Sequence, residues 1–283
     1  MSTPSGESKH IQLAEAAISR RFKEGRGSGS GRSYLPFLTV RDVPSKGRVH
    51  RLPSITVGRV HHLLSDLEHE IFCLLDWRDD VDDIREQFPI PRDDSRRLAD
   101  KLGIAHPSFG GADQVMTTDF IVDQNLNGFT RRKAISAKYA EDLEDPRVLE
   151  KMELERSYWL EKGIPFAIVT EKEIPKMLVE NIKWFRPYLD DRELSANEQK
   201  EYFSIFHDMS GLYGNQKVAA LTNRLDADYN SESGTHLAVL RHLLAQRAFT
   251  FDLENISVKN LKFQDLVPSE FWLTEQYQYV VGE

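Results

Sequence analysis

The feature that most constrains the fold of this 283-residue chain is a pair of segments joined by a tight turn. Residues 114–123 and 129–138 are rich in the β-branched and aromatic residues that are typical of strands. The turn between them, Asn125 to Gly128, contains an Asn-Gly dipeptide, which favours a hairpin. The segment is therefore predicted to form two paired antiparallel strands.

Helices and further strands flank this hairpin. Residues 65–76 carry an apolar stripe at helical spacing, and residues 84–90 alternate as a strand does. A capping aspartate followed by proline begins a helix over 145–162, and a buried strand follows at 165–170. Such a helix is suited to a crossover between parallel strands. The order helix, three strands, helix, strand predicts an α/β domain.

The pattern changes after residue 172. We therefore predict two domains, 1–172 and 173–283, of which the second is mainly helical and winged-helix-like. In the first domain the polar stretch 91–112 is not expected to form a regular element. In the second domain, helices are expected over 176–185, 215–228 and 235–247, and a further helix is expected to start at the Ser195–Glu198 capping box. The alternating pieces at 248–253 and 270–279 are expected to form a small hairpin.

The net charge of −8 conceals an uneven distribution. Residues 1–65 contain eleven Lys and Arg against four Asp and Glu, whereas residues 66–283 contain 26 basic and 41 acidic residues. Such an N-terminal excess of positive charge suggests an anion-binding segment, here a helix over 8–24 followed by a basic Gly-rich loop over 25–32. A solvated basic arm without a ligand explains the same charge about equally well.

Several protein classes are excluded by composition. The single cysteine, Cys73, excludes a disulfide framework and a cysteine-based zinc site, and its apolar neighbours predict a buried thiol. The polar first nine residues lack the apolar core of a signal peptide, and no apolar run approaches the roughly 20 residues needed to span a bilayer. We therefore expect a cytoplasmic protein with no membrane partner.

Three polar residues occupy places where apolar residues are expected. Glu68 lies at the edge of the apolar stripe of its helix, Asp119 lies inside a strand, and Lys138 ends the returning strand. Carboxylates suit Mg²⁺, which lowers the pKa of a bound water. A neighbouring lysine can position or deprotonate that water, or stabilise developing negative charge. The three residues form a candidate hydrolytic site.

Each of these residues also has a structural explanation. Ser65 to Glu68 matches a capping box, in which the glutamate satisfies a backbone amide. Asp119 and Lys138 also fit a cross-strand ion pair. The adjacent His61 and His62 do not have the spacing of metal ligands, so loop or surface positions are expected for them.

Five blocks of the sequence closely resemble the TnsA family of transposase endonuclease subunits. They span roughly residues 15–175 and are Arg20 to Gly27, Gly58 to Glu68, Asp83 to Pro89, Asp113 to Phe120 and Leu149 to Trp159. The resemblance implies a restriction-endonuclease-like core of the PD-(D/E)xK type. It also implies that Glu68, Asp119 and Lys138 are catalytic.

The resemblance further implies a metal site. Its ligands would be Glu68, Asp119, Ser136 and the carbonyl of Ala137, holding one or two Mg²⁺ ions. The family usually has Gln, or the wider superfamily an acid, where this chain has Ser136. A serine hydroxyl is shorter and neutral, so it coordinates through a water or not at all.

The implied function is cleavage of the 5′ strands at transposon ends during cut-and-paste transposition. The implied partners are double-stranded DNA, a TnsB-like transposase that cuts and joins the 3′ strands, and a TnsC-like AAA+ ATPase that docks on 173–283. The enzyme would be bacterial and DNA-associated. The residues expected to contact DNA phosphates are Arg26, Lys46, Arg48, Arg51 and Arg59.

Two other functions remain compatible with the same residues. A free-standing restriction or repair nuclease would share the fold and would cut DNA without partner subunits. A catalytically silent DNA-binding adaptor is the other alternative, and it gains weight from Ser136.

Overall fold

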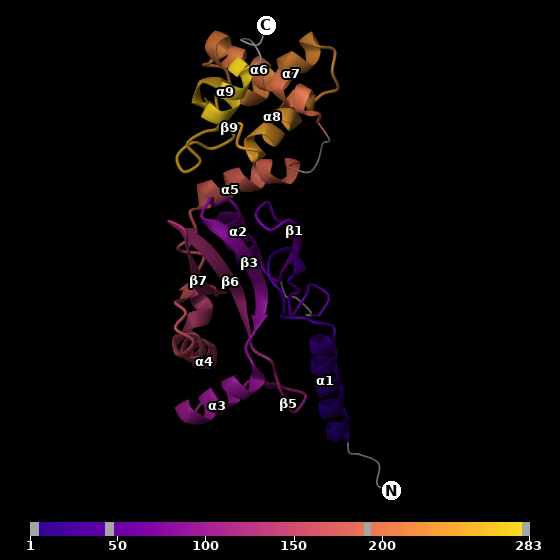
Figure 1. The fold of residues 1–283 in the computed structure, drawn as a ribbon, viewed down its shortest axis with the longest axis vertical. Helices are drawn as coiled ribbons and strands as arrows, with labels where there is room; N and C mark the ends of the chain where they lie inside the picture. Colours follow the sequence, from indigo (N-terminus) through magenta and orange to yellow (C-terminus); the bar gives the residue numbers. More distant parts are fainter. Residues whose placement is uncertain (1–5, 43–47, 190–193, 279–283) are drawn as a thin grey trace. The chain divides into compact units, whose positions relative to one another are not determined.

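The expected hairpin forms the centre of a four-stranded sheet (Figure 1). Its strands are β6 (Thr117–Leu126) and β7 (Phe129–Ala137), which pair antiparallel. Asn127 and Gly128 both have positive φ values, 55° and 84°, as a two-residue hairpin turn requires. The sequence therefore predicted the turn at the correct residues.

The other two strands complete the order β3-β6-β7-β8. β3 (Val81–Pro89) pairs antiparallel with β6, and β8 (Phe166–Val169) pairs parallel with β7. The parallel pair is connected by α4 (Pro146–Glu161), whose N-cap Asp145 accepts a hydrogen bond from the backbone N of Arg147 at 2.7 Å. The predicted crossover is confirmed.

Two helices supply most of the apolar cover of this sheet. α4 packs Leu154, Tyr158 and Trp159 into one buried cluster with Ile121 and Ala134 of the hairpin. α2 (Asp66–Asp76) buries an apolar stripe that includes Cys73, which has no exposed surface. The thiol is buried, as expected.

The structure is a computed structural model that describes residues 6–42, 48–189 and 194–278. It divides into two compact units, 1–174 and 175–283. The described elements of the first unit that have not yet been named are α1 (Gly6–Lys23), η1 (Gly31–Ser33), β1 (His50–Pro53), β2 (Val60–Leu63), α3 (Arg92–Leu102), β4 (Ser108–Phe109), β5 (Ala112–Asp113) and η2 (Ala140–Glu144).

One of these elements corrects the sequence-based expectation. The stretch 91–112 contains the helix α3, although it was expected to lack regular structure. α3 is mostly charged and buries only Ser95, Leu98 and Ala99, so its sequence resembles a polar loop. Gly103, with a φ of 67°, ends the helix in the left-handed conformation that favours glycine.

The second unit is mainly helical, as expected. The capping box at Ser195 and Glu198 is present. The described elements are α5 (Lys176–Phe185), η3 (Arg186–Tyr188), α6 (Ala196–Tyr213), α7 (Val218–Asp228), α8 (Thr235–Ala245), β9 (Phe249–Thr250), η4 (Phe263–Asp265), β10 (Val267–Pro268) and α9 (Glu270–Gln278).

The small hairpin of this unit differs from the expected one. The predicted alternating piece at 270–279 is helix α9 over its described part, and Tyr279 lies outside the described residues. The partner of β9 is instead β10, two residues before α9. The expectation rested on alternation, which over so few residues does not distinguish a strand from a helix.

Candidate active site

Glu68 enters the site from the first turn of α2. It is only 6% exposed. Its Oε2 accepts hydrogen bonds from the backbone N of Leu64 at 2.9 Å and from Nε2 of Gln87 at 3.2 Å. Half of the expected capping box is present, because Ser65 Oγ accepts from the Glu68 backbone N at 3.0 Å, whereas the carboxylate of Glu68 accepts from the backbone N of Leu64 and not from that of Ser65. The cap therefore fixes the carboxylate of Glu68 without removing it from the site.

Asp119 lies on β6, 9% exposed, between two fixed donors. Its Oδ2 accepts from the backbone N of Ala137 at 2.7 Å, and its Oδ1 accepts from Nε2 of Gln87 at 3.3 Å. Glu68 and Asp119 therefore converge on a single amide nitrogen. Burial raises the pKa of Glu68 to about 8, and the nearby charge of Asp119 adds to this rise.

Lys138 follows directly on β7 and faces the same carboxylate. Its Nζ lies 3.4 Å from Oδ2 of Asp119 and donates to the carbonyl oxygen of Ala137 at 2.7 Å. Burial alone would lower the pKa of this lysine. The carboxylates of Asp119, Glu155 and Glu68 outweigh that effect and raise its pKa above the ordinary value, so Lys138 is a cation in this arrangement.

Ser136 and Glu155 form a second buried pair behind Asp119. The Ser136 hydroxyl, on β7, donates to Oε1 of Glu155, on α4, at 2.5 Å, and each residue is only 1% exposed. Burial raises the pKa of Glu155 to about 7, and the charge of Asp119 contributes to the rise. Glu155 was not among the residues that the sequence predicted for the site. Its spacing from Met152 and Tyr158 on the buried side of α4 was the available signal.

A divalent cation fits the groups at this site. Within the described residues, no cluster of three or more His, Cys, Asp or Glu side chains is arranged to hold a metal. The site instead offers the two carboxylates of Glu68 and Asp119 and the carbonyl of Ala137. This donor set suits Mg²⁺, which commonly uses one or two protein carboxylates and completes its shell with waters and phosphate oxygens.

The chain matches known endonucleases along most of its length. The family described as TnsA-like endonuclease N terminal matches residues 78–171, and that described as TnsA endonuclease C terminal matches residues 173–253. Transposon Tn7 transposition protein TnsA of Escherichia coli is 43% identical over 270 residues, which cover 95% of this chain and 97% of that protein. The chain belongs to the TnsA endonuclease family.

Membership of this family establishes the activity of the chain. This TnsA-family protein is a DNA endonuclease and a subunit of a transposase, so the sequence-based identification is confirmed. The family also indicates a divalent metal cofactor and a transposase complex acting on DNA. No helix among the described residues is long and apolar enough to cross a membrane.

The basic residues expected to contact DNA lie in different environments. Arg48 has a side chain that is 83% exposed, 3.4 Å from Asp66, and Arg51 is exposed on β1. Arg26 is instead largely covered, because it pairs with Glu24 and Asp42. Lys46 lies outside the described residues.

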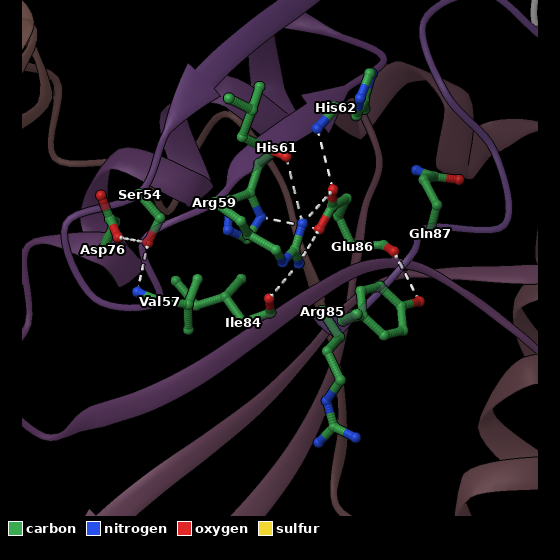
Figure 2. A network of polar contacts seen from close by, with 12 residues as sticks. Ser54, Val57, Arg59, His61, His62, Asp76, Ile84, Arg85, Glu86 and Gln87 are labelled. Atoms are coloured by element: carbon green, nitrogen blue, oxygen red, sulfur yellow. Dashed lines mark hydrogen bonds and ion pairs between the residues drawn. The ribbon is translucent and has the colours of Figure 1, made fainter. Parts of the chain in front are cut away.

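Arg59 of this TnsA-family endonuclease lies in a buried ion pair, not at the surface. Its guanidinium donates to both carboxylate oxygens of Glu86, at 2.6 and 3.0 Å, and its side chain is 8% exposed (Figure 2). His61, on β2, has no exposed surface and places Nδ1 2.9 Å from Glu86 Oε2. The expectation of a loop or surface position for His61 is therefore wrong. Arg59 and His61 both lie beside Glu86 because a buried carboxylate requires charged or polar partners.

Proposed function

We propose that this endonuclease hydrolyses the 5′ strands at transposon ends with Mg²⁺ as cofactor, within a restriction-endonuclease-like domain at 1–172. One observation carries the proposal. The carboxylates of Glu68 and Asp119 converge on a single amide nitrogen, and Lys138 Nζ lies 3.4 Å from Asp119. Two convergent carboxylates beside a lysine suit the hydrolysis of a phosphodiester.

Each residue has a distinct part in this proposal. Glu68, Asp119 and the carbonyl of Ala137 would hold one or two Mg²⁺ ions. When bound, the metal lowers the pKa of a coordinated water and neutralises charge on the scissile phosphate. Lys138, as a cation, stabilises the negative charge that develops on the phosphate oxygens.

Ser136 stands where a metal contact was expected. Because its hydroxyl donates to Glu155 at 2.5 Å, we assign Ser136 the role of holding that carboxylate behind Asp119. Any contact of Ser136 with the metal would run through a water. In its ionised form Glu155 adds negative charge near the site, which favours binding of a divalent cation.

The proposed partners divide between the two domains. A TnsB-like transposase would cut the 3′ strands at the same transposon ends. A TnsC-like AAA+ ATPase would dock on the winged-helix-like domain at 173–283, because that domain has 17 acidic and 11 basic residues and its negative balance suits protein docking better than DNA contact. The reaction would take place in the bacterial cytoplasm.

Strand-specific cleavage tests this function directly. The chain is assembled with its TnsB-like and TnsC-like partners on transposon-end DNA that carries separate labels on the 5′ and 3′ strands. We expect that omitting the chain abolishes the 5′ cuts and leaves the 3′ cuts. Persistence of the 5′ cuts would contradict the proposal, and robust cutting by the purified chain alone would favour a free-standing nuclease.

Arg48 and Arg51 give a second prediction, because they are the exposed members of the basic set. Removing a lysine or arginine that contacts a phosphate lowers the slope of log affinity against log salt by about 1. We therefore expect the double variant Arg48→Ala, Arg51→Ala to bind transposon-end DNA more weakly, with a slope smaller by about 2.

The matched control is Arg156→Ala, an exposed arginine of α4 that pairs with Glu153 at 2.7 Å. It should leave both affinity and slope unchanged. Fluorescence anisotropy over a range of salt concentrations measures both quantities. Equal slopes for the double variant and the unaltered protein would remove Arg48 and Arg51 from the DNA interface.

A further inference from the structure

Gln87 is a buried polar residue that joins the two carboxylates of the site. It is 2% exposed, and its Nε2 donates to Glu68 at 3.2 Å and to Asp119 at 3.3 Å. Its Oε1 accepts from the Thr117 hydroxyl at 3.0 Å, which turns the amide nitrogen toward the carboxylates. All the hydrogen bonds of this amide are therefore made within the site.

We propose that Gln87 is a positioning residue that holds Glu68 and Asp119 in the arrangement that binds the divalent metal. The inference rests on the metal site described under Proposed function. Two neighbouring carboxylates repel each other when both are ionised. A shared donor offsets that repulsion and fixes both side chains, so the carboxylates are oriented before a cation arrives.

The backbone of Gln87 shows that its position is imposed by its surroundings. Its φ of 49° lies in the left-handed region, which is uncommon for a residue other than glycine and persists only where neighbouring contacts enforce it. Two such contacts come from the N-terminal segment. The Tyr34 hydroxyl donates to the Glu86 carbonyl at 3.0 Å, and the Phe37 backbone N donates to the Gln87 carbonyl at 3.2 Å.

The contacts of Glu86, the residue before Gln87, also hold strand β3 in place. Glu86 is fully buried and is bound by Arg59 and by the backbone N of His62 at 3.1 Å. Arg59 also donates to the Ile84 carbonyl at 2.7 Å, so the ion pair is tied to the backbone of β3. In Figure 2 the side chain of Gln87 extends away from this pair. The pair therefore anchors β3 while the amide reaches the site.

Metal binding in the absence of DNA tests the role of Gln87. Titration calorimetry of the full chain with Mn²⁺ and with Mg²⁺ gives the Kd without requiring cleavage. Loss of a residue that orients metal ligands typically weakens binding by roughly 10- to 100-fold. We expect Gln87→Met to raise the Kd by that factor. Thr117→Val should raise it by a smaller factor, because the amide loses its orientation but remains present.

Gln124→Met is the matched control. Gln124 lies on β6 and its Nε2 donates to a carboxylate outside the site, Oδ2 of Asp80, at 3.1 Å. The control should keep the Kd of the unaltered protein. Asp119→Asn should abolish binding, which shows that the measured Kd belongs to this site.

These measurements distinguish failure of the proposed role of Gln87 from failure of the proposed metal site. A purely structural Gln87 would change the melting temperature of the metal-free protein and leave the Kd unaltered, so an unchanged Kd in Gln87→Met overturns the inference. If Gln87→Met does not fold, an unchanged Kd in Thr117→Val overturns it instead. Metal binding that is absent from the unaltered chain, or that survives Asp119→Asn, overturns the metal site itself and the role of Gln87 with it.

Discussion

Replacing Asp119 by alanine is expected to reduce 5′-strand cleavage by a factor on the order of 10³ or more, while 3′-strand cleavage by the partner transposase continues. Asp119 contacts three other parts of the site, which are the backbone of Ala137, Nζ of Lys138 and the amide of Gln87. Fixed groups that stabilise charge at a reacting centre commonly account for factors of about 10²–10³ each. Losing Asp119 removes a proposed metal ligand and also the ion pair that holds Lys138 beside it.

The measurement uses transposon-end DNA labelled on each strand, with Asp123→Ala as the matched control. Asp123 lies on the same strand, and its ion pairs with Arg85 and Arg132 lie outside the site. The control should therefore lose some stability and still cut. Asp119→Asn keeps the size of the side chain and should behave like the alanine variant. Cleavage of the 5′ strands within tenfold of the unaltered rate would remove Asp119 from the catalytic site.

Local signals in the sequence were sufficient for the elements around the site. The Asn127-Gly128 turn and the Asp145 cap each specify an element boundary through their own chemistry, and each is present. The Ser195 capping box does the same for a helix of the second unit. α3 was missed because most of its residues are charged, which made the segment resemble a polar loop. The segment 270–279 was misjudged because alternation over so few residues does not distinguish a strand from a helix.

The residues of the site also fall into two groups, those that the sequence revealed and those that it did not. Glu68, Asp119 and Lys138 stand out because each is polar at a position where its element should be apolar, and the structure brings them together. Gln87 and Glu155 were missed because their roles depend on partners far apart in the chain, Thr117 for one and Ser136 for the other. Arg59 was taken for a DNA contact because charge alone does not reveal a buried acidic partner.

Replacing Glu86 by alanine is expected to destabilise the protein by roughly 3–5 kcal/mol, because it leaves Arg59 buried without its counter-ion. Both carboxylate oxygens of Glu86 accept from that guanidinium, and neither group has appreciable contact with solvent. Chemical denaturation followed by circular dichroism measures the change. Arg156→Ala, which removes an exposed ion pair, should cost about 0–1 kcal/mol.

The same ion pair predicts how stability depends on pH. Burial alone would raise the pKa of Glu86, but His61 and Arg59 hold it at about 2, below the ordinary value of 4.5. Because the pKa is lowered in the folded state, the stabilisation is fully present above about pH 4.5 and is lost as the pH falls toward 2. The loss of stability over this range should be shallower in Glu86→Gln than in the unaltered protein.

A double variant separates the charge of this pair from its packing. Replacing a buried ion pair by apolar residues of similar volume is often neutral, whereas removing one partner leaves an uncompensated charge. We therefore expect Arg59→Met, Glu86→Leu to recover most of the stability that Glu86→Ala loses. If the double variant is as unstable as the single one, the contribution of Glu86 comes from its hydrogen bond to the backbone of β2 and not from compensation of Arg59. An equally steep acid-dependent loss in Glu86→Gln would show that this loss arises from other carboxylates.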